Sequence, residues 1–172
     1  MKSDKYAFIK VGEKDEFVEK TFKGFCEVIP QKHVDSFVIA DPFSAPNLAR
    51  DLAKSGYYHA IIVSAMFFND IDFRKDHIAS ALASGLMAVS MDVDALVLPI
   101  VLLPRHGQEE EWRREEHSDY FLSQGRNTAK SALKDSKLIS QLYYLPIKSS
   151  FINHQQNFDA TILEYVKKSL ES

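Results

Sequence analysis

The sequence predicts an α/β fold, a three-layer α/β/α sandwich in which helices cover both faces of a four-stranded parallel sheet. Short apolar runs alternate with amphipathic stretches in the order β-α-β-α-β-α-β. The third and fourth runs are almost continuously apolar, as expected of strands that are covered on both faces. The chain has 172 residues, of which 45% are hydrophobic, and this suits one compact domain with its own core.

The first half of the chain contains two strand–helix pairs. Residues 6–11 form the first predicted strand, and apolar positions at helical spacing predict a helix over residues 14–27. Residues 36–40 form the second strand. Small and apolar residues then repeat at helical spacing from Ala45 to Ala53, and Gly56 is a plausible helix terminator.

The second half begins with a strand over residues 60–65, a helix over 78–87 and a strand over 95–103. Pro99 has no N–H to donate, so the last strand should lie at an edge of the sheet or contain a bulge. Further helices are expected from Glu109, from 126 to 133 after Gly125, and from 158 to 170, with a loop or irregular arm over residues 142–150. We expect one domain over residues 1–172, with residues 134–172 as a C-terminal extension that ends in a helix.

Composition and charge exclude several classes of function. The chain has 21 Lys and Arg against 24 Asp and Glu, so it lacks the basic surface that binds nucleic acid or anionic membranes. The single cysteine, Cys26, excludes an internal disulfide and fits a reducing, cytoplasmic location. The glycines are scattered and the histidines lack metal-ligand spacing, so we expect no cofactor and no metal.

Ligands of open parallel sheets bind at the carboxyl ends of strands, so the predicted site lies in the loops after the four strands. The loop after the third strand, residues 67–77, holds three acids, two cations and a histidine before an apolar helix. Asp70 or Asp72 would cap that helix. Alternatively Arg74, Lys75 and His77 would hold an anion at its N-terminus.

A resemblance to a known family runs through residues 53–91. Eight positions match the family pattern in place, namely Gly56, Tyr58, Ala60, Asp76, Gly85, Leu86, Val89 and Ser90, and the stretch resembles the core of 6,7-dimethyl-8-ribityllumazine synthases. The segments LLPRH (102–106) and EHSDYF (116–121) resemble the type II, decameric branch. The resemblance implies a flavodoxin-like protomer that forms homopentamers or decamers with active sites between subunits.

The same resemblance implies a reaction, which is the condensation of 5-amino-6-ribitylamino-uracil with 3,4-dihydroxy-2-butanone 4-phosphate without a metal or cofactor. Imine formation, phosphate loss and ring closure need positioning and proton transfer. The implied catalytic positions are Arg74, where the family has its histidine, together with Lys75 and His77.

Several positions implied to bind substrate depart from the family pattern, whereas the ring-contacting Phe43 is retained. Glu13 stands where the family has a stacking aromatic residue, and Ser44 stands where it has a ribityl-binding glutamate. Gln124 replaces a lysine, and acids flank the turn that holds the phosphate in the family. Met66, Phe67 and Phe68 are expected to form an apolar wall of the ligand cleft together with the edge-strand pair Leu98 and Pro99, or else to pack the interface between subunits. The full set of implied substrate contacts is Glu13, Pro42, Phe43, Ser44, Met66, Phe67, Phe68, Asp70, Ile71, Asp72, Leu98, Pro99 and Gln124.

These departures lead us to expect a divergent paralogue that condenses a different amine with a carbonyl compound at a subunit interface. A genuine lumazine synthase of riboflavin biosynthesis, in which Lys75 or His77 replaces the missing histidine, is the alternative. A third possibility is a non-catalytic ligand-binding or assembly protein that uses residues 142–172. In the catalytic cases the partners are a small-molecule substrate and further copies of the chain.

Overall fold

The structure is a computed structural model that describes residues 5–13, 15–67, 75–93, 95–103 and 117–144. The chain divides into two compact units, Met1–Ser136 and Lys137–Ser172. Of the second unit, the structure describes residues 137–144, which are helical.

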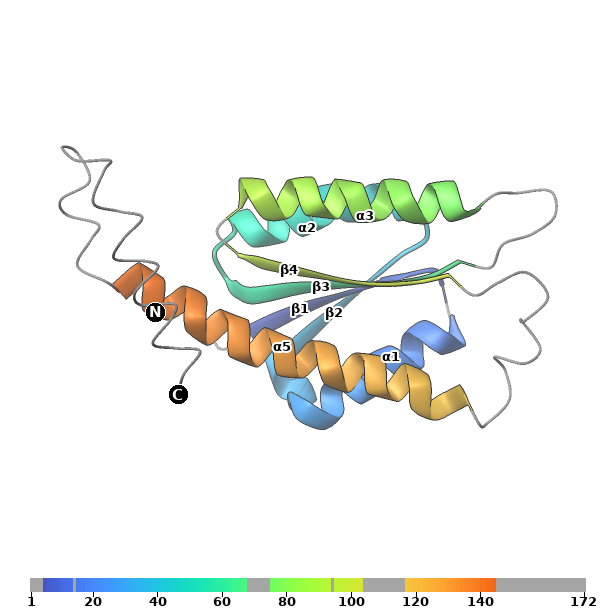
Figure 1. The fold of residues 1–172 in the computed structure, drawn as a ribbon, viewed down its shortest axis with the longest axis horizontal. Coiled ribbons are helices and arrows are strands. Elements are labelled where there is room, and N and C mark those ends of the chain that lie inside the picture. The colour runs from blue at the N-terminus through green and yellow to red at the C-terminus, as the bar shows by residue number, and fades with distance from the viewer. Residues whose placement is uncertain (1–4, 14, 68–74, 94, 104–116, 145–172) are drawn as a thin grey trace. The chain divides into compact units, whose positions relative to one another are not determined.

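The centre of the first unit is a four-stranded parallel sheet with the strand order β2-β1-β3-β4. Its strands are β1 (Lys5–Val11), β2 (Val34–Ile39), β3 (Tyr58–Met66) and β4 (Leu96–Leu102). Helices α2 (Ala45–Lys54) and α3 (Lys75–Asp92) cover one face of the sheet (Figure 1). Helix α1 (Glu16–Val28) and the first part of α5 (Ser118–Tyr144) cover the other. The predicted three-layer, flavodoxin-like α/β fold is therefore confirmed.

Alternation along the strands divides the apolar side chains between two cores. Ala7, Ile9 and Val11 of β1 pack with the buried alanines of α2 and the leucines of α3. Tyr6 and Phe8, which alternate with them, pack on the other face with the phenylalanines of α1 and α5. Successive side chains of a strand point to opposite faces, so the short strand β1 contributes to both cores.

The helix α5 differs from the sequence prediction. A helix break before residue 126 was expected, yet α5 runs without interruption through Gly125 and on to Tyr144, across residues 142–144 that were predicted as a loop. A Cβ atom at Gly125 would lie 2.0 Å from the carbonyl oxygen of Thr21, and one at Gly24 would lie 2.1 Å from that of Leu122. Gly125 therefore serves the close packing of α5 on α1 rather than the end of a helix. The helix predicted over residues 109–121 is described from residue 117 on, where residues 118–121 are the first residues of α5. Residues 109–116 and the helix predicted over 158–170 lie outside the described residues.

The amino ends of three strands are joined by a cluster of polar side chains. The Nζ atom of Lys5 on β1 lies 2.8 Å from Oδ1 of Asp35 on β2. The hydroxyl of Tyr58 on β3 donates a hydrogen bond of 3.1 Å to Oδ2 of the same carboxylate. Lys5 beside Asp35 lowers the pKa of this carboxyl group. Burial, reinforced by the hydrogen bond to Asp35, raises the pKa of Tyr58 to about 12.

We expect Tyr58 to make the protein less stable at high pH. Its pKa is higher in the folded chain than the ordinary 10.0, so between these values the folded state binds more protons than the unfolded state. The free energy of unfolding must then fall as the pH rises through this interval. Urea unfolding at pH 8 and pH 11 should show a smaller loss of stability for Tyr58→Phe than for the wild type. Tyr57→Phe, at the exposed neighbouring ring, is the control. It should lose nearly as much as the wild type, because Tyr57 is the smallest of the causes that raise the Tyr58 pKa. Equal losses in all three proteins would contradict the prediction.

Within the described ranges, none of the helices combines the length and the apolar character needed to cross a lipid bilayer.

Candidate functional site

The strand order places the candidate site at the carboxyl ends of β1 and β3. From β1 the chain crosses to β2 on one side, whereas β3 and β4 lie on the other side, so the order reverses between β1 and β3. Ligands of open α/β sheets bind in the crevice outside the strand ends at such a reversal. The described residues at this edge include Glu13 after β1, residues 40–44 after β2 and Phe67 after β3.

The connection from β1 to α1 is fixed at both of its ends. Gly12 has a φ of 99°, which glycine adopts without strain, and its N–H donates a hydrogen bond of 2.8 Å to the carbonyl oxygen of Ile39 on β2. At the other end, Oδ1 of Asp15 accepts hydrogen bonds from the backbone N–H groups of Phe17 and Val18 and caps α1. The connection thus presents Glu13, which is exposed, at the carboxyl edge of the sheet.

The connection from β2 to α2 is a short 3₁₀ turn, Pro42–Ser44, which is held by Asp41. Oδ1 of Asp41 accepts a hydrogen bond of 3.0 Å from the Phe43 N–H, and the Ser44 hydroxyl donates one of 3.2 Å to Oδ2. The Phe43 side chain lies outside both cores, and the residue is 62% exposed. The exposed ring can pack against a flat polar ligand, and the carboxylate and hydroxyl beside it can accept hydrogen bonds from that ligand.

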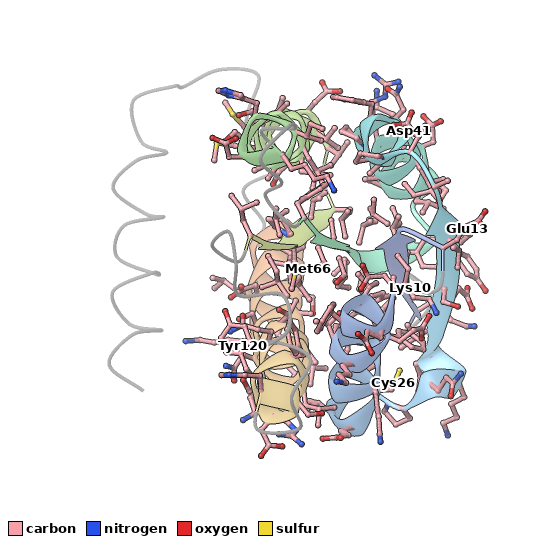
Figure 2. The ribbon with its side chains drawn as sticks, turned by 90° about the vertical axis from the view of Figure 1, so that its right-hand side faces the viewer. Lys10, Glu13, Cys26, Asp41, Met66 and Tyr120 are labelled. Atoms are coloured by element: carbon pink, nitrogen blue, oxygen red, sulfur yellow. The ribbon has the colours of Figure 1, made fainter. Side chains whose placement is uncertain are left out.

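Side chains at the ends of β3 contribute to the cores rather than to an open apolar wall. Met66 packs on the α1 face of the sheet and Phe67 on the α3 face, and both residues are buried. Figure 2 shows Glu13 and Asp41 toward the same side of the molecule, with Met66 nearer its middle. Phe68, the third member of the predicted wall, lies outside the described residues. Ligand contacts at Met66, Phe67 and Phe68 stay predictions.

The edge strand β4 carries Leu98 and Pro99. The carbonyl oxygen of Leu102 accepts a hydrogen bond of 2.9 Å from the Phe67 N–H, so even-numbered residues of β4 turn their backbone groups toward β3. Pro99 therefore turns its backbone nitrogen away from the sheet, as predicted for an edge strand, and it is exposed. Leu98 is partly buried against the core between the sheet and helices α1 and α5.

The predicted catalytic residues are only partly described. Lys75 is the first residue of α3 and is half-buried, whereas His77 is exposed on the first turn of that helix. Gln124 is half-buried on α5. Outside the described residues lie the remaining predicted ones, Asp70, Ile71, Asp72 and Arg74. Both interpretations of this loop, a helix cap and an anion site, therefore stay predictions. The roles given to all of these residues stay predictions.

A buried ion pair near the candidate site was not predicted from the sequence. Lys10 of β1 is buried, and its Nζ atom lies 2.6 Å from Oε1 of Glu19 on α1. The same Nζ lies 4.6 Å from the centre of the Phe22 ring. The alternation of β1 held the signal, because Lys10 follows Tyr6 and Phe8 at the positions that face α1.

Two other chemistries find little support in the described part of the chain. Burial raises the pKa of the Cys26 thiol, and Lys10 opposes this only in part, so Cys26 remains a protonated thiol and a weak nucleophile at neutral pH. Among the described residues, no group of three or more His, Cys, Asp or Glu side chains is arranged to hold a metal ion. The expectation that the reaction needs no metal stays a prediction.

Comparisons with known proteins agree on one family over most of the chain. Residues 7–140 match the family described as 6,7-dimethyl-8-ribityllumazine synthase. The chain is 34% identical to 6,7-dimethyl-8-ribityllumazine synthase of Rhodococcus erythropolis over 126 residues, which cover 70% of the chain and 79% of that protein. It is 28% identical to 6,7-dimethyl-8-ribityllumazine synthase 2 of Pseudomonas syringae pv. tomato over 134 residues, or 75% of the chain and 79% of that protein.

A short stretch is similar to a protein with a different name. Over 39 residues, which make up 23% of the chain, the identity to tetraacyldisaccharide 4'-kinase of Flavobacterium johnsoniae is 80%. That stretch spans only 12% of the kinase, whereas the match to the lumazine synthase family extends over residues 7–140 and so includes the sheet and the helices on both of its faces. The chain belongs to the 6,7-dimethyl-8-ribityllumazine synthase family.

Proposed function

We propose that this chain is a working 6,7-dimethyl-8-ribityllumazine synthase, which condenses 5-amino-6-ribitylamino-uracil with 3,4-dihydroxy-2-butanone 4-phosphate. The observation that carries this proposal is the family match over residues 7–140, together with 34% identity to a relative that bears this enzyme's name. The departures at Glu13 and Ser44 favour a paralogue with another substrate when the sequence is taken alone, whereas the family match favours the synthase.

The exposed groups at the carboxyl edge suit the pyrimidine substrate. The ring of Phe43 is exposed and free to stack on the pyrimidine. Position 44 lacks the acidic side chain of the family, but the Ser44 hydroxyl is hydrogen-bonded to the exposed carboxylate of Asp41. We infer that Asp41 supplies the acceptor for the ribityl hydroxyl groups from three residues upstream.

The chemistry itself makes modest demands on the protein. The amine of the pyrimidine adds to the ketone carbonyl, and water leaves as the imine forms. Phosphate is then eliminated, and a second water leaves when the ribitylamino nitrogen closes the ring. Holding the two substrates together replaces a bimolecular encounter with an oriented one. The remaining need is proton transfer, for which we propose His77 and Lys75, since both lie on the first turn of α3. Arg74, in the position of the family histidine, would bind phosphate rather than move protons.

A divergent paralogue that condenses a different amine with a carbonyl compound is the second candidate. The observation that favours it is Glu13, an exposed carboxylate at the end of β1 where the family has a stacking ring. A carboxylate at this edge would attract a cationic amine and oppose a phosphate. The acids at positions 70 and 72 add to this charge in the sequence.

Product formation separates the two candidates. Purified protein is incubated with both substrates, and the fluorescence of the lumazine is followed against the uncatalysed reaction. A rate clearly above that background supports the synthase. No gain over background, with a rise in melting temperature on addition of aliphatic amines but not of the ribityl-pyrimidine, supports the paralogue. If neither rate nor melting temperature responds, the chain is not an enzyme of this kind and the assembly function gains support.

We also propose that the chain belongs to the type II branch and assembles as a homopentamer or decamer. The segments LLPRH and EHSDYF support the type II assignment. The outer face of α3 supports assembly, because Met87 and Met91 are 67% and 85% exposed there. Large apolar side chains that are so exposed on a helix mark a surface suited to burial against another protein.

Charging this face of α3 should break the assembly. We expect the double variant Met87→Lys/Met91→Lys to have a lower mass by light scattering than the wild type, because two ammonium groups would have to be desolvated at the interface. Asp51→Lys, at an exposed position on α2, introduces the same side chain elsewhere and should keep the wild-type mass. A monomeric wild type, or an unchanged mass in the double variant, would contradict the proposal.

A further inference from the structure

We propose that Lys10 is a positioning residue: its ion pair with Glu19 holds the connection after β1 so that the Glu13 carboxylate accepts a hydrogen bond from an amino group of the pyrimidine substrate. The ion pair thereby sets the affinity for that substrate. The inference rests on the proposed function, because it needs an amine substrate at the carboxyl edge of the sheet. Lys10 is buried, whereas Glu13 and Phe43 at the same edge of the sheet are exposed.

The environment of Lys10 is unusual for a lysine. In the part of the chain that the structure describes, Lys10 is the one charged residue among the buried ones. Its side chain is 11% exposed, whereas that of its partner Glu19 is 50% exposed. Burial of an ammonium group is costly unless the group is paired, and Lys10 meets this need with Glu19 and with the face of Phe22. The charge is thus held in one geometry.

The ion pair spans the connection that carries Glu13. Lys10 lies three residues before Glu13 on β1, and Glu19 lies six residues after it on α1. Inside this span, Gly12 is bonded to Ile39 of β2, and Asp15 caps α1. The pair ties the end of the strand to the first turn of the helix, so it limits how far α1 can shift against β1. Any such shift would move Glu13.

Packing alone does not call for a lysine at this position. Tyr6 and Phe8, its neighbours on the same face of β1, are apolar or aromatic and pack in the core. A methionine has nearly the same length and would fill the same space. Replacement of a buried ion pair by apolar groups of similar volume is often neutral for stability. Removal of Lys10 alone leaves no buried charge behind, because the half-exposed Glu19 carboxylate stays in contact with water. We therefore infer that the charge of Lys10 serves to hold α1 in one position against β1.

The test compares two lysines on the same strand. Lys10→Met removes the ion pair near the carboxyl edge, and Lys5→Met removes the pair with Asp35 at the amino edge. Amide hydrogen exchange is measured for the peptide that covers residues 12–18, whose N–H groups include those bonded to Ile39 and Asp15. We expect exchange in this peptide to rise by about tenfold in Lys10→Met, as for loss of a hydrogen bond to a charged group. Lys5→Met should leave it unchanged.

Kinetics supply the second readout. We expect Lys10→Met to raise KM for 5-amino-6-ribitylamino-uracil by about fivefold, as for loss of one charged contact, with kcat nearly unchanged. Glu19→Gln should reproduce the rise in KM. Lys10→Arg should restore most of the wild-type KM, because a guanidinium group can pair with Glu19 and stack on Phe22. Lys5→Met should keep the wild-type KM.

The possible outcomes are distinguishable. Unchanged exchange in Lys10→Met, or an equal rise in Lys5→Met, would overturn the positioning role whatever the activity. Faster exchange with an unchanged KM would overturn the link to affinity. A wild type without any lumazine product would refute the proposed function, and the exchange rates of residues 12–18 would still decide whether Lys10 holds this connection.

Discussion

Replacement of Gly125 by alanine is expected to lower the free energy of unfolding by about 3 kcal/mol, the upper end of the usual cost of overpacking. The added Cβ would lie 2.0 Å from the carbonyl oxygen of Thr21 and 2.7 Å from the backbone nitrogen of Phe25. Both atoms belong to the backbone of α1, so no side-chain rotation relieves the clash. The two helices must move apart, and the packing of Phe121 against Phe17 is lost with them. Urea unfolding followed by circular dichroism measures the change.

Gly56→Ala is the matched control for this prediction. Gly56 has a φ of 68°, and a Cβ atom there would meet nothing within 4 Å. Its cost is therefore conformational alone, about 1 kcal/mol. Gly24→Ala, on the other helix of the contact, should resemble Gly125→Ala, because its Cβ would lie 2.1 Å from the carbonyl oxygen of Leu122. Should Gly125→Ala prove no more harmful than Gly56→Ala, the close approach of α1 and α5 would be wrong.

Removal of the Phe43 ring is expected to have the largest effect on substrate binding. Loss of a base-stacking aromatic side chain costs about 1–3 kcal/mol, so Phe43→Ala should raise KM for the ribityl-pyrimidine by about tenfold or more. The residue is 62% exposed and lies outside both cores, so the free energy of unfolding should stay within about 0.5 kcal/mol of the wild type. Initial rates of lumazine formation and urea unfolding measure the two quantities.

Two further variants show whether the ring itself is responsible. Phe43→Tyr keeps the ring and should keep a KM close to that of the wild type. Phe8→Ala removes a ring that is fully buried and should reduce stability by about 3–5 kcal/mol. A Phe43→Ala protein with an unaltered KM would remove Phe43 from the substrate site.

The sheet and its covering helices were predictable because each strand and helix carries its own periodic pattern. Their ends were less predictable, because contacts between strands decide them. Strand β2 was expected from Ser36 but begins at Val34, and the added residues include Asp35, which binds Lys5 of β1 and Tyr58 of β3. Helix α3 likewise extends to Lys75 and Asp92 beyond its apolar centre. Such partners lie far apart in the sequence, and a local pattern does not contain them.

Gly125 shows why a local rule failed for α5. Glycine is a common helix terminator, and the sequence around residue 125 offers no sign of another use. The reason for glycine at position 125 lies in α1, about a hundred positions earlier in the sequence. There the backbone of Thr21 and Phe25 leaves no room for a Cβ atom on Gly125. A glycine that faces another helix and a glycine that ends its own helix cannot be told apart in the sequence until the partner helix is known.

The candidate site was predictable in place but only partly in detail. The carboxyl edge follows from the parallel sheet, and the structure puts Glu13 and Pro42–Ser44 there. Met66 and Phe67 were expected to form one apolar wall, yet they are consecutive on an extended chain and so pack on opposite faces of the sheet. The ion pair of Lys10 and Glu19 was visible only as a lysine at an inward position of β1.

The most direct test of a lumazine synthase site at the carboxyl edge is amide hydrogen exchange of the wild-type protein with and without 5-amino-6-ribitylamino-uracil. Binding is expected to slow exchange in the peptides that cover residues 12–18 and 41–48, which contain Glu13 and Phe43. The peptide of residues 31–36, which includes Asp35 at the amino edge, should exchange at the same rate in both samples. Protection confined to the amino edge, or no protection anywhere at a saturating concentration, would contradict the assignment.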